Sequence, residues 1–275
     1  MSSLLDYDFM RRALVAAALV GLIAPLIGVF LVQRRLALLG DGMGHVALTG
    51  VGLAFLLGTA PIPTAMATAV LGAFLIEFIR YRSRTAGDVA LALLFYGGIA
   101  GGVMFASLAP GKASSSLNSY LFGSLSTVAD GDLWALGVLG LAVVVVIAIL
   151  GRELFAVSLD PDIAAVQGIR VRVLSTLMAV LAAVVVVVGM RVVGLLLVSA
   201  IMIVPVAAAQ QVTRSFRATA VVAIVVGLVA SLTGLVGSFY VEVPPGPTIV
   251  LVALLCFAVF AMIAVPVRRR RRDLA

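Results

Sequence analysis

Long runs of apolar residues alternate along the chain with short connections that carry most of the charge. Each run is close to the ~20 residues that an α-helix needs to cross a bilayer. The runs predict an all-α polytopic membrane protein with eight to nine transmembrane helices, in a single transmembrane domain over residues 1–275. The number of helices stays open because two of the apolar runs meet closely around Met190 and Arg191. They fall at residues 12–33, 36–58, 62–79, 88–108, 132–150, 171–190, 192–212, 217–237 and 247–266.

The composition supports a membrane protein and argues against nucleic acid as a partner. Hydrophobic residues make up 63% of the chain and charged residues only 11%, whereas soluble domains carry about 25% charged residues. Five of the positive charges behind the net charge of +7 stand in one terminal run, Arg268–Arg272. The single cysteine, Cys256, lies in an apolar run and is expected to be a small buried side chain.

The distribution of lysine and arginine over the connections predicts the orientation of the chain. If the first segment enters from outside, 15 basic residues fall on cytoplasmic connections and four on outer ones. Because cytoplasmic connections are enriched in Lys and Arg, the N-terminus is expected outside and the C-terminus in the cytoplasm. Arg11 and Arg12 are the exceptions, and long side chains at a helix end can reach the interface.

The second segment, Gly40–Gly58, carries two ionisable side chains inside an apolar run. Asp41 and the only histidine of the chain, His45, are four residues apart, so a helix places them on one face, one turn apart. Counted from Arg35, Asp41 lies ~9 Å and His45 ~15 Å into a hydrocarbon core of ~30 Å. A charge at this depth is costly unless it faces a cavity or a polar group. The pair is therefore a candidate cation site, although a packed polar pair that ties helices together would have the same spacing.

Two further features concern partners and the path through the membrane. In the longest predicted cytoplasmic connection, Gly151–Arg172, Asp160 suits an N-cap and Pro161 the first helical position. A short helix over Pro161–Gln167 is therefore expected on the cytoplasmic face, as a docking surface or a capped linker. Pro205 lies inside an apolar segment, where proline favours a kink, and we predict a helix break near the translocation pathway there.

Motifs for chemistry on a bound substrate are missing. Gly111-Lys112 lacks the upstream glycine and the Ser or Thr of a Walker A loop, and there is no G-x-S-x-G elbow. These absences favour a transport subunit that is not an enzyme and has no ATPase site or permanently bound cofactor. A secondary transporter with Asp41 and His45 as a proton relay remains the main alternative, and a membrane-embedded enzyme a weaker one.

Over almost its whole length the chain resembles the ABC-3 family, the permease subunits of bacterial zinc and manganese ABC importers. The resemblance rests first on Arg34-Arg35, Gly40-Asp41 and His45, followed by Leu48 and Gly50. Further matches, weak alone but specific in their order, are Tyr120-Leu121-Phe122-Gly123, Asp160-Pro161-Asp162 with Ala164 and Gly168-Ile169, Val193–Leu197, Pro205 with Ala209, and Pro244-Pro245-Gly246-Pro247.

The resemblance implies a fold, partners and site residues. The fold is that of ABC importer permeases of the metal-chelate and vitamin B12 type, in the plasma membrane of a bacterium. The implied partners are a second copy of the chain, a separate ATP-binding subunit and an extracytoplasmic metal-binding protein. Asp41 and His45 match the family's intramembrane metal pair, and one hard and one borderline ligand suit Mn²⁺, Zn²⁺ or Fe²⁺. Two side chains underfill a metal site, so either a second protomer or water would complete it. The ATPase-coupling helix, about 159–169, includes Asp160, Pro161, Asp162, Ala164, Ala165 and Gly168.

Overall fold

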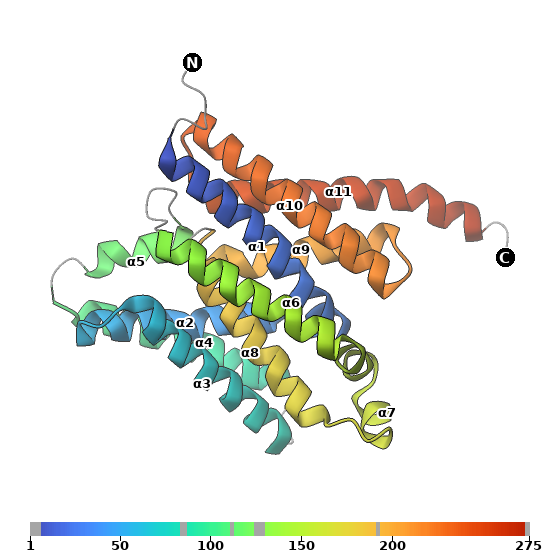
Figure 1. Cartoon of the computed structure of the whole chain (residues 1–275), viewed down its shortest axis with the longest axis horizontal. Helices are drawn as coiled ribbons and strands as arrows, with labels where there is room; N and C mark the ends of the chain where they lie inside the picture. The colour runs from blue at the N-terminus through green and yellow to red at the C-terminus, as the bar shows by residue number, and fades with distance from the viewer. Residues whose placement is uncertain (1–6, 83–86, 111–112, 124–129, 191–192, 273–275) are drawn as a thin grey trace.

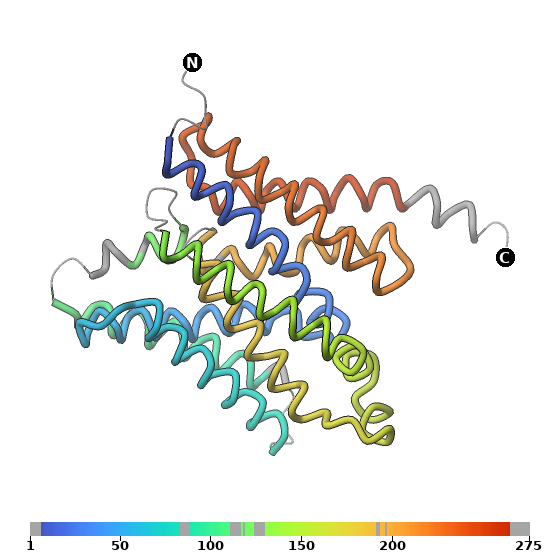
Figure 2. Tube along the Cα trace, in the orientation of Figure 1, coloured from blue at the N-terminus to red at the C-terminus, as the bar shows by residue number. Residues whose placement is uncertain are grey.

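The protein is a bundle of long helices, seen as ribbons in Figure 1 and as a Cα trace in Figure 2. The computed structural model describes residues 7–82, 87–110, 113–123, 130–190 and 193–272. Within these ranges all regular structure is helical. The helices are α1 (Asp8–Gln33), α2 (Ala37–Leu57), α3 (Pro61–Arg82), α4 (Gly87–Leu108), α5 (Ala113–Phe122), α6 (Asp130–Leu159), α7 (Pro161–Val166), α8 (Val171–Gly189), α9 (Leu195–Val212), α10 (Phe216–Val241) and α11 (Pro245–Arg272).

Eight helices of the described chain are long and apolar enough to cross a membrane: α1, α2, α3, α4, α6, α8, α10 and α11. The ninth predicted segment is α9, whose 18 residues include the shorter apolar stretch Leu197–Val212. The prediction of an all-α protein with eight to nine transmembrane helices is therefore confirmed.

One end of the bundle, here called the α7 end, gathers the C-terminal ends of α1, α3 and α6 with the N-terminal ends of α8 and α10. Arg34, just after α1, donates a hydrogen bond to Ser175 Oγ of α8 at 2.8 Å. The ring of Phe216 in α10 packs against those of Phe30 in α1 and Phe155 in α6, with centroids 5.0 and 4.6 Å apart. The arginine-rich connections of the sequence therefore meet at one end.

The opposite end, the α5 end, contains the N-terminal ends of α1 and α6 and the turn between α8 and α9. Arg12 of α1 pairs with Asp130 of α6 at 2.8 Å, which gives one of the two outlying arginines a counter-charge. Gly194, with a φ of +94°, packs so closely on the Leu121–Gly123 backbone that a Cβ would lie 2.5 Å from the Leu121 carbonyl oxygen. Because Gly194 precedes α9 at this end, α9 returns toward the α7 end.

Three boundaries differ from the sequence prediction. The predicted connection Gly151–Arg172 begins only after Leu159, because α6 continues through Arg152 and Glu153, both good helix formers, as far as Leu159. The stretch between the predicted segments 88–108 and 132–150 contains α5, where Leu117 is buried although serines precede it. The connection between the predicted segments 217–237 and 247–266 shrinks to residues 242–244, because α10 extends to Val241 and α11 begins at Pro245. Proline is tolerated at this position because the first helical residue needs no N–H donor.

Candidate functional site

Helix α2 carries both candidate metal ligands, and its glycines let α4 come into direct backbone contact with it. A Cβ on Gly98 of α4 would lie 2.5 Å from the carbonyl carbon of His45, and one on Gly102 would lie 2.7 Å from Leu48 Cγ. Thr49 Oγ1 also donates a hydrogen bond to the Gly98 carbonyl oxygen at 2.8 Å. Small residues therefore fix the position of the α2 backbone around the ionisable pair.

Asp41 and His45 lie on one face of α2, as predicted, but they are not hydrogen-bonded to each other. The distance from His45 Nε2 to Asp41 Oδ1 is 3.9 Å, longer than a hydrogen bond. Two ligands of one ion with bonds of ~2.1 Å stand about 3.0–3.4 Å apart at octahedral or tetrahedral angles. A closure of about 0.5–0.9 Å would let both side chains bind the same ion.

A third polar group reaches the pair from another helix. Ser199 of α9 donates a hydrogen bond through its Oγ to Asp41 Oδ1 at 3.2 Å, and Ser199 itself is buried. The sequence analysis did not single out Ser199, because a lone serine in an apolar helix usually bonds its own backbone. Its only signal was its position two residues after the matched Val193–Leu197 stretch.

Asp41 opens onto a cavity between α2 and α4, whereas His45 lies behind an aromatic side chain. The cavity measures about 300 Å³ and is lined by Leu38, Asp41, Gly42, Leu91, Ala92, Phe95 and Tyr96. The side chain of Asp41 is 30% exposed and that of His45 only 6%. The Phe95 ring meets the imidazole edge-on, with centroids 4.1 Å apart. A cation in this cavity would therefore meet Asp41 first.

The donor set of the pair is small within this protomer. His45 Nδ1 is buried and has no hydrogen-bond partner among the described residues. No group of three or more His, Cys, Asp or Glu side chains that could hold a metal occurs in the described part of the chain. The described side chains gathered at the site are therefore Asp41, His45 and Ser199.

The predicted helix after Asp160 is present, and one of its proposed contact residues faces inward. The Asp160 carboxylate accepts from the backbone N–H of Asp162 and Ile163 at 2.9 and 3.0 Å, capping α7 with Pro161 at its first turn. Ala164 is 1% exposed and belongs to a small core with Leu154 and Leu174, so it supports α7 and is not available to a partner in this structure.

The outward face of α7 is formed by other residues. Ile163 and Val166 are 58% and 90% exposed, and Ala165 is exposed between them. Gly168, with a φ of +81°, follows the C-cap as predicted. Ile163 and Val166 could not be predicted from the sequence, because apolar side chains at this spacing in a membrane protein carry no signal of which way they face.

The predicted helix break at Pro205 is wrong, because α9 continues through this residue from Leu195 to Val212. Proline still removes one backbone hydrogen bond there, and Pro205 is buried. Its role at a translocation pathway stays a prediction.

Comparisons with known proteins agree with this fold. The family model for the ABC 3 transport family matches residues 6–264. The manganese import system permease protein ScaB of Streptococcus parasanguinis is 32% identical over 275 residues, which cover all of this chain and 98% of the relative. PsaBC from Streptococcus pneumoniae, solved in complex with Fab, superposes with a TM-score of 0.84 at 30% identity, over 94% of this chain and 92% of that chain. An inward-facing ABC transporter assigned to the metal-chelate type shares the fold, with a TM-score of 0.75 at 18% identity over 92% of this chain and 85% of that chain. The chain belongs to the ABC 3 transport family.

Proposed function

We propose that this chain is the permease subunit of an ATP-driven importer for divalent transition metal ions, with manganese as the first candidate and zinc or iron next. Family membership supports the permease role, and the printed name of the Streptococcus parasanguinis relative supports manganese. The observation that carries the proposed path is the Asp41–His45 pair, which lies inside a candidate membrane span with Asp41 on the wall of a cavity. The 3.9 Å gap suits a shared cation better than direct proton transfer between the two groups.

Asp41 and His45 have distinct tasks in this proposal. The carboxylate offsets part of the 2+ charge, and the neutral imidazole adds a borderline ligand that manganese and zinc accept. Ser199 holds the carboxylate in place through its hydrogen bond. The Phe95 ring packs edge-on against the imidazole and covers one side of it.

Uptake measurements test this path. Asp41→Asn and His45→Ala should each reduce manganese uptake by about tenfold or more, because even the loss of an outer-shell partner commonly costs that much. Asp8→Asn is the matched control, since the Asp8 side chain is 87% exposed at the far end of α1. Wild-type uptake by both site variants, at normal membrane levels, would show that the metal path lies elsewhere. Uptake that persists without the ATP-binding subunit would instead favour a secondary transporter.

The partners follow from the two ends of the bundle. The ATP-binding subunit is proposed to dock on α7 through Ile163, Ala165 and Val166, in the cytoplasm of a bacterial cell. An extracytoplasmic metal-binding protein would deliver the ion at the α5 end. A second copy of the chain is proposed to complete the permease. The cavity beside Asp41 would then face the second copy, or the ion path between the two copies.

Cysteine labelling tests orientation and docking together. In a Cys256→Ala background, Thr59→Cys at the α5 end should react with an impermeant thiol reagent in intact cells, while Ala165→Cys should not. In inside-out vesicles Ala165→Cys should react, and the ATP-binding subunit should protect it. Labelling of Ala165→Cys in intact cells would reverse the orientation, and labelling unchanged by the bound subunit would remove α7 from the contact.

A further inference from the structure

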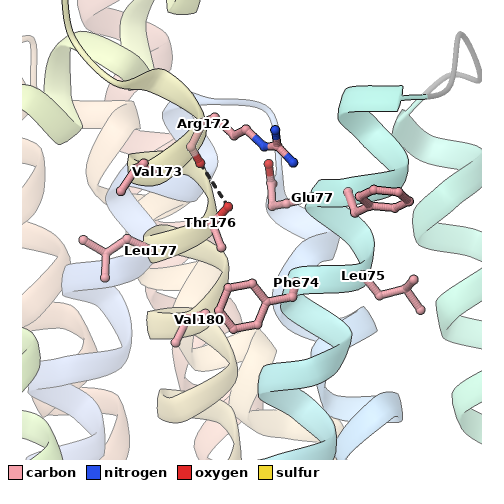
Figure 3. A pocket seen from close by; sticks show the side chains of 9 residues that line it. Phe74, Leu75, Glu77, Arg172, Val173, Thr176, Leu177 and Val180 are labelled. Atoms are coloured by element: carbon pink, nitrogen blue, oxygen red, sulfur yellow. Dashed lines mark hydrogen bonds between the residues drawn. The ribbon is translucent and has the colours of Figure 1, made fainter.

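A groove separate from the metal site runs along the outer surface between α3 and α8. It measures about 830 Å³, within the ~300–1,000 Å³ range of ligand pockets. Figure 3 shows Phe74 and Val180 at one end of the groove, and Glu77 and Arg172 at the other. Phe74 is 54% exposed and Phe78 50% exposed. The groove is therefore an open apolar channel with a charged mouth.

The groove has the depth of part of one bilayer leaflet. Its lining spans five residues of α3, from Phe74 to Phe78, and nine residues of α8, from Arg172 to Val180. The longer side, in α8, covers eight helical steps. At 1.5 Å per residue this is ~12 Å, against ~15 Å for half of the hydrocarbon core. Both helices are candidate spans, so the charged mouth lies near the interface at the α7 end, and the apolar floor lies among the lipid chains.

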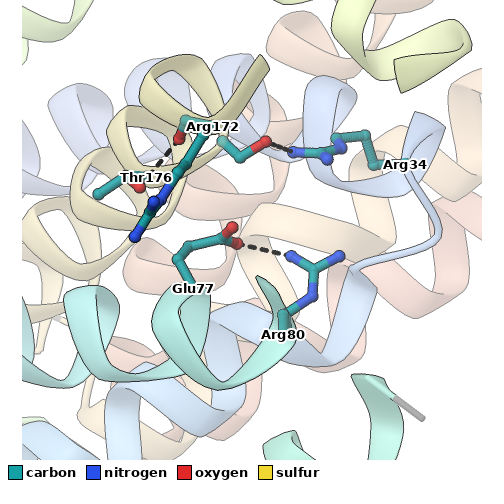
Figure 4. A network of polar contacts seen from close by, with 6 residues as sticks. Arg34, Glu77, Arg80, Arg172 and Thr176 are labelled. Atoms are coloured by element: carbon teal, nitrogen blue, oxygen red, sulfur yellow. Dashed lines mark hydrogen bonds and ion pairs between the residues drawn. The ribbon is translucent and has the colours of Figure 1, made fainter. Parts of the chain in front are cut away.

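The mouth of the groove has an excess of positive charge. Arg80 donates to Glu77 Oε1 at 2.6 Å, and Arg34 donates to Ser175, as Figure 4 shows. Glu77 is thus already paired, while Arg172 is exposed and held over the Tyr81 ring at 4.4 Å. Burial lowers the pKa of the Arg34 guanidinium below its ordinary value and the charge of Arg80 lowers it further, with Glu77 acting in the opposite direction.

We propose that this groove binds an anionic phospholipid from the leaflet at the α7 end, with the phosphate on Arg172 and an acyl chain along Phe74, Phe78 and Val180. Arginine matches phosphate oxygens with its planar fork of donors, and basic pockets between membrane helices are a known basis of lipid recognition. The lipid would hold α3 against α8 beside the segment that follows α7. A protein partner would have to bury the same apolar floor at a depth where lipid already surrounds the helices.

Native mass spectrometry of the full-length permease tests the proposal. The protein is mixed with equal amounts of phosphatidylglycerol and phosphatidylcholine that carry the same acyl chains. The wild type should retain more phosphatidylglycerol, and Arg172→Gln should lower that excess by about fivefold, the effect expected of one basic side chain near a membrane surface. Arg172→Lys should keep most of it. Val180→Phe, which fills the groove, should reduce the adducts of both lipids.

The control is Arg152→Gln, an exposed arginine of α6 at the same end of the bundle but outside the groove. It should leave the adducts unchanged. An equal loss in Arg152→Gln, no preference in the wild type, or release of the lipid by inorganic phosphate would overturn the proposal. A change in the number of permease copies with Val180→Phe, or loss of the ATP-binding subunit with Arg172→Gln at unchanged lipid, would assign the groove to a protein contact.

Discussion

Helices α2 and α6 are both long enough to cross the membrane, but they are built on opposite principles. Of the eight candidate spans in the described chain, α2 is the least apolar and α6 the most apolar. The least apolar stretch is 67% buried, whereas the most apolar one is only 17% buried. A soluble protein would show the reverse order.

The difference follows from the solvent. Lipid tails are as apolar as leucine, so burial brings no gain to a leucine and close backbone packing brings helices together instead. In α2 five glycines and His45 are buried among neighbours, while α6 presents Leu141 and Ile149 to its surroundings at 65% and 73% exposure. Low hydropathy in α2 therefore reflects its glycines and its ionisable pair and not exposure to water; it is no general mark of the interior, since α1 is equally buried and far more apolar.

An acidic side chain like that of Asp41, placed on the exposed face of α6, should give the largest effect, on membrane insertion. Leu141→Asp places a carboxylate near the centre of the exposed face of α6, where insertion costs about 2.5–3.5 kcal/mol. The inserted fraction, read from a glycosylation reporter next to α6, should fall steeply. Leu141→Ala is the control and should insert normally. Normal insertion of Leu141→Asp would mean that this face of α6 is covered by a partner and not by lipid.

Adding one methyl group to a glycine should change the stability of the protein less, and in opposite directions in α2 and α6. A Cβ on Gly50 of α2 would meet Thr68 Oγ1 and lie 2.6 Å from the Ala65 Cα in α3, whereas a Cβ on Gly137 of α6 has no described atom within 4 Å. Gly50→Ala should cost about 1–3 kcal/mol through overpacking. Gly137→Ala should be neutral or stabilise by up to about 1 kcal/mol.

Thermal unfolding in detergent, followed by fluorescence or light scattering, distinguishes the two glycine variants. Equal midpoints would contradict the packing difference between α2 and α6. If Gly50→Ala also keeps its uptake rate, α2 can shift relative to α3 without moving the candidate site.

The sequence predicted the helices well and the lateral arrangement poorly. Length and hydropathy are local properties, so eight to nine spans, the Asp41–His45 face and the capped helix at Asp160 all follow from neighbours in sequence. Which helix covers which face depends on contacts far apart in the chain. The sequence therefore gave no warning that Ser199 reaches Asp41 across 158 residues, or that Ala164 points into a core.

Helix boundaries were predicted wrongly where the sequence changes only gradually from membrane segment to connection. Charged residues at 152 and 153 suggested the end of a membrane segment, but arginine and glutamate also continue a helix, and α6 does so until Asp160 caps the next one. The serines before Leu117 suggested a loop, and only packing of Leu117 and Tyr120 against the core explains why α5 forms. The arginines near α3 and α8 were predicted as an orientation signal, and their three-dimensional grouping around the groove was not visible.

The smallest effect is expected from removing a single hydroxyl beside α2, that of Ser199. Comparison with Ser231 distinguishes a hydroxyl that supports the site from one that is only buried. Ser199→Ala removes the hydrogen bond to the Asp41 carboxylate, and bonds to charged groups contribute about 1.5–3 kcal/mol. The half-saturating manganese concentration should therefore rise by about tenfold, which corresponds to the lower end of this range, with unchanged protein in the membrane. Ser231→Ala is the control, because the Ser231 hydroxyl is buried without a partner among the described residues, and it should leave uptake unchanged. Since Ser199 acts through Asp41, adding Ser199→Ala to Asp41→Asn should cause no further loss. An additive loss in the double variant would mean that Ser199 contacts the ion directly, and no loss in either serine variant would mean that Asp41 is positioned by α2 alone.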